Sequence, residues 1–450
     1  MRLPVLDRRR AGVLLHLGSL HDGLGRGGRA FIDWLAQAGF SVWQFLPLGP
    51  VGADASPYWV RSDCAGNPAF IDPNERPQTD TDEYRDFLDA SRDWLEDFAL
   101  FDAIGRAHDH APWWDWPVEL RDRDAGSLDA ARSRYAEDIE RIRQEQFAFA
   151  VQWRRLREYA HARGVRLFGD IPFYVAPDSA ETWAHREQFQ LDASGRPTAV
   201  AGVPPDYFSE LGQLWGNPLY DWRVMRRDGF KFWRARVGRQ LERLDLLRID
   251  HFRALASHWS VPAGAPDARG GHWVPTPGRA LLLALRKDFG ELPIVAEDLG
   301  LITPDVGELL EKFSLPGMRV LQFGFSGEGD NPHLPHMHPR NGVVYTGTHD
   351  NDTTLGWFRS LNADTQYQVT FLLRSLPQDV VEAMVRAALG SVAQLAVIPA
   401  QDVLELGSEA RLNTPGTAVG NWQWRMASGA PGPELAPRFL RLNRIYGRAP

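Results

Sequence analysis

The chain has 450 residues, of which 44% are hydrophobic and 24% are charged, and this composition excludes disordered, fibrous and membrane-spanning proteins. The net charge of −8 provides no electrostatic footprint for nucleic acid or an anionic membrane, and the single cysteine, Cys64, excludes an intramolecular disulfide and a cysteine-rich metal site. The first ten residues are charged, and the apolar run after them breaks at His16. We therefore expect no signal peptide and a cytoplasmic enzyme.

Short apolar runs that end in polar or Gly/Pro turns recur along the whole chain. Runs this short and this apolar are typical of strands that are buried on both faces of a parallel sheet. Eight such strands are predicted, at residues 13–17, 42–48, 165–173, 246–252, 294–299, 318–325, 343–348 and 394–403.

Helical patterns separate the predicted strands, among them residues 28–38, 145–162, 229–244, 278–289 and 378–389. Alternation of strand and helix eight times predicts an α/β fold, a (β/α)8 TIM barrel, that spans residues 1–450 as a single catalytic unit. Two intervals are too long for one helix, and they predict insertions on the C-terminal face after strands 2 and 3, at about residues 50–164 and 174–244. A separate second domain is the alternative for these segments.

Acidic residues stand at the ends of several predicted strands. In a barrel of this type the C-terminal ends of the strands line the active site. Four of the eight strands end in a carboxylate among apolar neighbours, and a fifth ends in Gln401 and Asp402; the four acids are Asp170, Asp250, Glu297 and Asp350. A single acid here is commonly a turn former, but four like charges on one rim indicate a functional site.

Strand alternation places Arg248 and Asp250 on the same face, where the guanidinium would hold the carboxylate ionised as a nucleophile requires. Glu297 follows the next strand with Val295 below it, and an apolar wall would keep that acid protonated near neutral pH. Neighbouring strands are about 4.8 Å apart, so the two carboxyls should lie roughly 5 to 6 Å apart, which fits a retaining rather than an inverting glycosidase. Asp350 would stabilise the oxocarbenium-like charge.

Acids on successive strand ends could instead hold Mg²⁺, as Asp170, Asp250 and Glu297 would in an enolising lyase. That chemistry requires a lysine or histidine base, and none of the three lysines lies at a strand end. His349 stays a candidate base, whereas Arg248 beside Asp250 argues against a cation there. A catalytically silent binding module is a second alternative.

Longer motifs then resemble a known family. RIDHF, AEDLG and TGTHDNDTT, in this order, resemble the α-amylase clan. The wider set is similar to the amylomaltase (4-α-glucanotransferase, disproportionating enzyme) family over nearly the whole chain; it includes FLPLGP, SPY, AGNP, GDIPFYVAPDSAETW, VAGVPPDYFSELGQLWGNPLY, GMRVLQF, LPH and LGSEARLNTPGTAVGNWQWR.

The resemblance implies an enzyme that moves α-1,4-glucan segments between maltooligosaccharides through a covalent glycosyl–aspartate intermediate, without cofactor or metal. It implies Asp250 as nucleophile, Glu297 as general acid/base and Asp350 as transition-state stabiliser. The implied substrate-binding residues are Tyr58, Asp170, Gln213, Trp215, Arg248 and His349. An α-glucan hydrolase with the same site is the alternative, and the sequence leaves the oligomeric state open, with a monomer favoured.

Residues 202–218 are rich in Gly, Pro and aromatic side chains, and we expect Pro204, Pro205, Tyr207 and Phe208 to cover the intermediate and exclude water. The stretch after Asp72 is shorter than the family usually has. In relatives, the resemblance implies, the missing piece contributes to a remote glucan-binding surface.

Several other polar residues carry structural expectations. We expect His251 to be a hydrogen-bonded histidine between barrel and helices, and Asp298 to bind backbone groups. His333, His336 and His338 should be loop residues rather than metal ligands.

Overall fold

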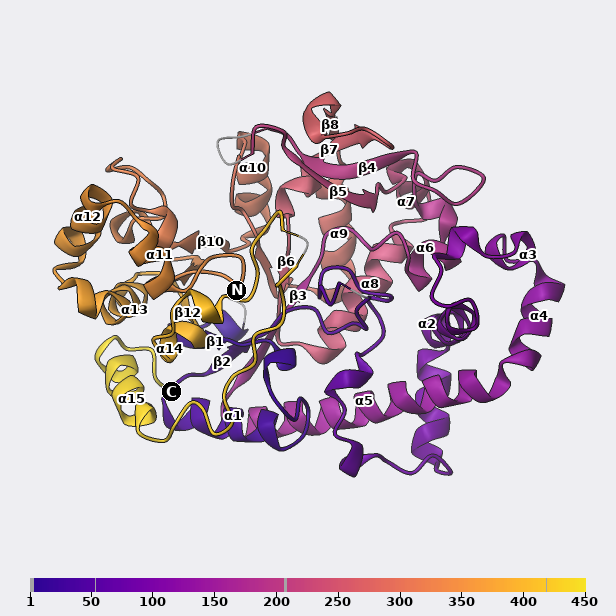
Figure 1. The fold of residues 1–450 in the computed structure, drawn as a ribbon, viewed down its shortest axis with the longest axis horizontal. Helices are drawn as coiled ribbons and strands as arrows, with labels where there is room; N and C mark the ends of the chain where they lie inside the picture. Colours follow the sequence, from indigo (N-terminus) through magenta and orange to yellow (C-terminus); the bar gives the residue numbers. More distant parts are fainter. Residues whose placement is uncertain (1–3, 53, 206–208, 418) are drawn as a thin grey trace.

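A parallel sheet of eight strands forms the centre of the computed structural model, which describes residues 4–52, 54–205, 209–417 and 419–450 (Figure 1). The strands are hydrogen-bonded in the order β10-β11-β12-β1-β2-β3-β6-β9. Their bounds are β1 (Arg10–Leu14), β2 (Val42–Gln44), β3 (Arg166–Ile171), β6 (Leu246–Ile249), β9 (Ile294–Ala296), β10 (Gly317–Val320), β11 (Gly342–Tyr345) and β12 (Leu395–Pro399). The amide of Ala296 donates to the carbonyl of Pro316 over 2.9 Å, which brings the two outer strands together into a nearly closed barrel.

All eight predicted strands are present, and the (β/α)8 architecture is confirmed. Most observed strands are shorter than predicted, because the apolar residues continue beyond the hydrogen-bonded ladder; Phe45, Leu46 and Leu48 are buried after β2 has ended. The first strand begins three residues earlier than predicted, at Arg10. A charged residue gives no apolar signal, and Arg10 is held by Asp7 and by the carbonyl of Val5.

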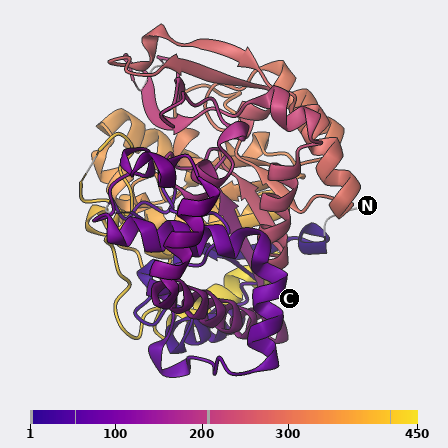
Figure 2. The ribbon, with the colours of Figure 1, turned by 90° about the vertical axis from the view of Figure 1, so that its right-hand side faces the viewer.

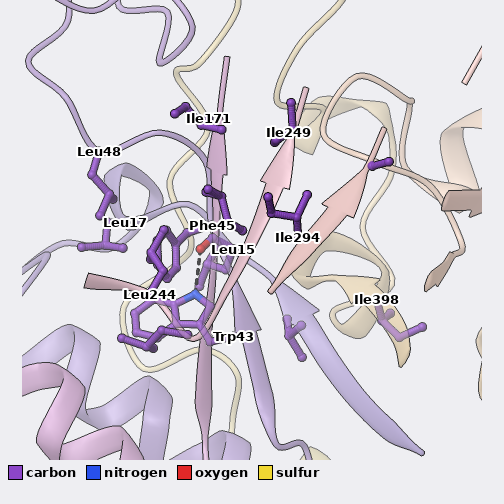
Figure 3. Packing of buried hydrophobic residues seen from close by; sticks show 14 of the residues in the cluster. Leu15, Leu17, Trp43, Phe45, Leu48, Ile171, Leu244, Ile249, Ile294 and Ile398 are labelled. Carbon is purple, nitrogen blue, oxygen red and sulfur yellow. Dashed lines mark hydrogen bonds between the residues drawn. The ribbon is translucent and has the colours of Figure 1, made fainter. Parts of the chain in front are cut away.

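Side chains alternate between the inside and the outside of the barrel, as the period of two requires. The inner cluster comes from nearly every strand and contains Leu14, Val42, Phe168, Leu246, Val295, Met318, Val320, Val343, Tyr345, Leu395 and Val397. Figure 3 shows part of the outer cluster, where Ile171, Ile249 and Ile294 lie on neighbouring strands. The indole N–H of Trp43 there donates to the carbonyl of Leu15 over 2.8 Å.

Helices cover the outside of the barrel. The five predicted helices are present, and the second of them begins earlier than expected, at Ala136. The helices that follow or precede barrel strands are α1 (Arg26–Gln37), α5 (Ala136–Ala162), α8 (Lys231–Arg243), α9 (Gly278–Phe289), α10 (Pro304–Phe313), α11 (Thr354–Ser360), α12 (Ala363–Leu373), α13 (Val380–Gly390), α14 (Ala400–Val403) and α15 (Leu435–Ile445). Their buried residues follow helical spacing, as Leu281, Leu282 and Leu285 do on α9.

Two excursions leave the barrel after β2 and β3. The first contains α2 (Asp82–Ala107), α3 (Val118–Arg121) and α4 (Ala125–Arg134), on the right of Figure 1. Its apolar cluster includes Phe101, Trp113 and Trp116, and Trp183 of the second excursion packs into the same cluster. The second contains α6 (Ala180–Ala184), β4 (Ala199–Val203), β5 (Gln213–Pro218) and α7 (Trp222–Arg227).

A third excursion, after β6, was not predicted. Its strands β7 (Ser257–Pro262) and β8 (His272–Pro275) join β4 and β5 in an antiparallel sheet of order β5-β4-β7-β8. Figures 1 and 2 both show this sheet at one end of the molecule, beside the barrel. The described residues of the range 202–218 therefore include the end of β4 and all of β5, which pair antiparallel in this sheet. No helix in the described part of the chain is long and apolar enough to cross a membrane.

Candidate active site

The acids that the sequence places at strand ends lie on the C-terminal rim of the barrel. Asp170 belongs to the end of β3, Asp250 and Glu297 directly follow β6 and β9, and Asp350 lies on the loop after β11. The β6–β9 register pairs Ile249 with Ala296, so Asp250 and Glu297 continue from neighbouring positions.

Arg248 connects two of these acids. One Nη donates to Asp170 Oδ2, and the other lies 2.7 Å from Asp250 Oδ1. Burial alone would lower the pKa of Arg248, but Asp170 and Asp250 outweigh it and hold that pKa well above its ordinary value. The predicted placement of Arg248 and Asp250 on one face is confirmed. The guanidinium of Arg248 is a permanent cation between the carboxylates of Asp170 and Asp250.

Asp170 and Tyr58 support this arginine. The Tyr58 hydroxyl donates to Asp170 Oδ2 over 2.7 Å, and the Asp170 side chain has no exposed surface. Burial, followed by the negative charge of Asp170, raises the pKa of Tyr58 well above its ordinary value, so this phenol stays a hydrogen-bond donor. Asp170 therefore acts on the rim through Arg248 and Tyr58 and not by direct exposure to the cleft.

Asp250 has 31% of its side chain exposed. Desolvation raises its pKa to about 6; Arg248 opposes this, while the charges of Asp170 and Asp350 add to it. Arg248 does not fully offset the effect of burial on this pKa, because its guanidinium is shared with Asp170. Asp250 is still the more acidic member of the pair and is ionised at neutral pH.

Glu297 is gripped by two backbone amides. The N–H of His251 donates to Oε2 and the N–H of Leu299 donates to Oε1, each over 2.8 Å. Desolvation and the nearby charge of Asp250 raise its pKa to about 8, although Arg248 and the Leu299 amide act in the opposite direction. Glu297 is therefore protonated at neutral pH, as the apolar wall on β9 predicted.

Asp350 lies beside His349 and is held by the C-terminal segment. Its Oδ2 is 3.3 Å from His349 Nε2, and Asn413 donates to its Oδ1 over 2.6 Å. Burial lowers the pKa of His349, so the ring is neutral at pH 7. The ring of Tyr58 stacks on His349 with 5.2 Å between centroids.

Three residues of the C-terminal segment reach the site without having been singled out from the sequence. Arg411 donates to the carbonyl of Asp350 over 2.9 Å, Asn413 binds the Asp350 carboxylate, and the ring of Trp422 lies 6.0 Å from those of Tyr58 and His349. All three belong to the motif LGSEARLNTPGTAVGNWQWR, which the family resemblance included. The motif has no strand pattern from which the direction of these side chains could be predicted.

The remaining predicted substrate-binding residues lie on β5. The Trp215 indole N–H donates to the side-chain oxygen of Gln213 over 3.1 Å, and the Trp215 ring packs edge-on against His251 at 4.7 Å. Tyr207 and Phe208, expected to cover the intermediate, lie outside the described residues.

His251 differs from its expectation. We expected a hydrogen-bonded ring, but the buried Nε2 of His251 has no hydrogen-bond partner within the described ranges.

Asp298 does bind backbone, since Met318 N–H donates to it over 2.5 Å. His333 and His338 make hydrogen bonds within their loop and to Ser391. Asp402, on α14 directly after β12, is buried and accepts from Thr346 and Thr354, so it is a structural acid. Across residues 4–52, 54–205, 209–417 and 419–450, no three His, Cys, Asp or Glu side chains are grouped to hold a metal ion.

Comparisons with known proteins show the family to which the chain belongs. A family model described as 4-alpha-glucanotransferase matches residues 15–81 and 74–430. The chain is similar to the 4-alpha-glucanotransferase of Thermus thermophilus, at 45% identity over 500 residues that cover 98% of this chain and 99% of that protein. It is similar to the protein of the same name from Synechocystis sp., at 41% identity, with 99% of both chains covered.

Among solved structures, the chain is similar to the amylomaltase from Streptococcus agalactiae in complex with acarbose, with a TM-score of 0.94 and 32% identity over 98% of this chain and 100% of that one. The amylomaltase from Corynebacterium glutamicum has a TM-score of 0.77 at 17% identity and covers 97% of this chain and 75% of its own, which supports the fold alone.

Proposed function

The chain belongs to the 4-alpha-glucanotransferase family, and from this premise we propose that Asp250, Glu297 and Asp350 perform the transfer by a retaining double displacement. The observation that carries the proposal is the contrast between two acids that follow neighbouring strands. Arg248 contacts Asp250 and favours its ionised form, whereas burial and the charge of Asp250 raise the pKa of Glu297, which lies between two backbone amides, to about 8.

In the first step, an Asp250 carboxylate oxygen attacks the anomeric carbon of a glucan while the bond from that carbon to the glycosidic oxygen breaks. Glu297 gives its proton to the departing oxygen, which leaves as the 4-hydroxyl of the released segment. In the second step, Glu297 takes the proton of an acceptor 4-hydroxyl. That oxygen bonds to the anomeric carbon, and the bond to Asp250 breaks.

The other predicted residues support these steps. Arg248, backed by Asp170 and Tyr58, keeps the nucleophile charged and fixed. Asp350 and His349 would bind hydroxyls of the reacting glucose, and Asp350 would oppose the positive charge that develops on the glucose ring. Gln213 and Trp215 on β5 would line the acceptor side of the cleft, where a flat indole suits a sugar face.

Transfer requires that an acceptor sugar, and not water, reaches the intermediate. We assign this exclusion to the connection between β4 and β5, which includes Pro204 and Pro205. Shortening that connection should raise hydrolysis relative to transfer. An unchanged ratio would remove this part of the proposal.

We propose that the segment that follows Asp72 is shorter here than in relatives. In support, the alignment with the Thermus thermophilus protein runs over 500 residues against 450 in this chain, and the two parts of the family match overlap at residues 74–81. We propose that long glucans and cyclic products are handled differently here than in relatives with a longer segment.

Incubation with maltotriose alone, followed by sizing of the products, tests the function. A ladder of longer maltooligosaccharides together with glucose is expected, whereas glucose and maltose alone would indicate a hydrolase. Asp250→Asn should abolish both products but retain glucan binding, and Asp86→Asn, on the exposed face of α2, is the matched control. Loss of activity after exhaustive EDTA treatment would instead favour the Mg²⁺-dependent alternative.

A further inference from the structure

His251 has an unusual backbone between the two proposed catalytic groups. Its φ and ψ are 49° and 47°, in the left-handed region that residues with a side chain adopt only occasionally. The residue before it is Asp250, and the residue after it, Phe252, donates its amide to the carbonyl of Glu297 over 3.1 Å. The left-handed turn at His251 therefore lies directly between the proposed nucleophile, Asp250, and Phe252, whose amide binds the backbone of Glu297.

This turn directs the His251 amide toward Glu297. The 2.8 Å bond from that N–H to Oε2, together with the Leu299 bond to Oε1, leaves each carboxyl oxygen one further lone pair. The carboxyl is thereby fixed in orientation, and the proton that it carries is confined to the positions that the two amides do not occupy. In a regular continuation of the β6–β9 ladder, the amide of residue 251 would donate to the backbone carbonyl of Glu297, and the amide of Phe252 takes that place here.

The ring of His251 makes a separate contact, with the antiparallel sheet. It packs edge-on against Trp215 of β5, with 4.7 Å between centroids, and lies 6.4 Å from the ring of Tyr174. Burial lowers the pKa of His251 to about 3, so the ring is uncharged over the working range and acts through packing.

We propose that His251 is a positioning residue for the acid/base: its left-handed turn holds Glu297, and its ring fixes that turn against Trp215 of the antiparallel sheet. The inference rests on the proposed function in which Glu297 is the acid/base. His251 would then connect Trp215, which is proposed to line the acceptor side of the cleft, with Glu297, which must deprotonate the acceptor.

The charged groups near Glu297 and His251 come from other residues. Asp250 and Arg248 of the β6 end and Asp298 of the β9 end face Glu297, while Arg253 and His258 face His251. None of these groups is altered by a substitution at position 251. A change in the alkaline limb of kcat/KM, which reports deprotonation of the acid, can therefore be assigned to the amide or to the ring.

Two substitutions separate the amide from the ring. His251→Val has a β-branched side chain that disfavours the left-handed region, so the amide is withdrawn from Glu297. Loss of a hydrogen bond to the carboxylate raises the Glu297 pKa, so the alkaline limb should move up by about one unit, and kcat should fall about tenfold. His251→Gly keeps the turn but admits water beside Trp215, so the limb should move down while kcat changes by less than about threefold.

Arg374 provides the matched control, because it is an exposed non-glycine residue with φ of 51° at the end of α12, a helix that Figure 1 shows at the outer edge of the molecule, away from β6. Arg374→Val should lower the melting temperature without moving the alkaline limb. If neither position-251 variant moves the limb, or if both move it in the same direction, the inference is wrong. If His251→Val does not fold, the alkaline limb of the His251→Gly variant is the deciding measurement.

Glu297→Gln separates a failure of this inference from a failure of the proposed function. A Glu297→Gln enzyme with normal transfer would overturn the proposed function itself.

Discussion

Arg248 and Asp250 are joined by a contact of 2.7 Å between Nη2 and Oδ1, and the same guanidinium also binds buried Asp170. Two carboxylates and one cation leave this cluster with a net negative charge. The cation must therefore be permanent and must reach both acids at once, and the planar, forked guanidinium does both.

Arg248→Lys should reduce kcat/KM by about 100-fold or more, because a single ammonium cannot replace both contacts of the fork. The weaker cation leaves Asp250 harder to ionise, so the acid limb of the kcat/KM profile should also move to higher pH. Steady-state assays on a maltooligosaccharide across pH measure both effects. Arg234→Lys, in the exposed pair with Asp288, is the control. Equal loss in both variants would contradict the role given to Arg248.

The pH profile of kcat/KM should be bell-shaped. Activity should fall as the pH drops below about 6, where Asp250 becomes protonated and cannot attack, and should fall again above about 8, where Glu297 loses the proton that it donates. The two limbs belong to the coupled pair and not to either residue alone. A profile that stays flat from pH 5 to 9 with unchanged rate-limiting chemistry would contradict the assignment.

Asp402→Ala should destabilise the loop that carries His349 and Asp350. Asp402 accepts hydrogen bonds from the hydroxyl of Thr346 and from the amide and hydroxyl of Thr354, on either side of that loop. Removing the acceptor leaves three buried donors unpaired, so the free energy of unfolding should fall by about 3 kcal/mol. Denaturant unfolding measures the loss, and Asp129→Ala, in an exposed pair with Arg132, should cost less than about 0.5 kcal/mol.

Glu181 should give the stability a pH dependence of its own. Desolvation, together with the charge of Asp63, raises its pKa to about 7, while Asp63 itself is paired with buried Arg236 at 2.6 Å. Because the folded pKa is raised, the stabilising contribution of Glu181 is complete below its ordinary pKa and is lost as the pH rises through about 7.

Glu181→Gln stays neutral at every pH. The variant should therefore gain stability relative to the parent chain between pH 5 and pH 8, by about 2 kcal/mol. Chemical unfolding at the two pH values measures this difference, and Glu308→Gln on α10 should show none. A Glu181→Gln difference that shrinks with rising pH would have the wrong sign.

The predicted fold was correct because local patterns carry the relevant information. Each barrel strand is buried on both faces, so its apolar run is visible in the sequence, and the turn that ends it marks the rim. The antiparallel sheet escaped prediction because β7 and β8 carry polar residues and tryptophans, and because β7 pairs with β4, more than fifty residues earlier. Pairing between such distant segments leaves no trace in either one.

The sequence by itself determined the barrel, the rim and the placement of Arg248 and Asp250 on one face, because alternation along a strand is a property of consecutive residues. Only the tertiary structure decided how these groups are charged and held. Tyr58 meets Asp170 across 112 positions, and the amides that grip Glu297 come from the ends of two different strands. Those contacts depend on how loops close in three dimensions, and so do the desolvation and the neighbouring charges that set the pKa values of the two acids.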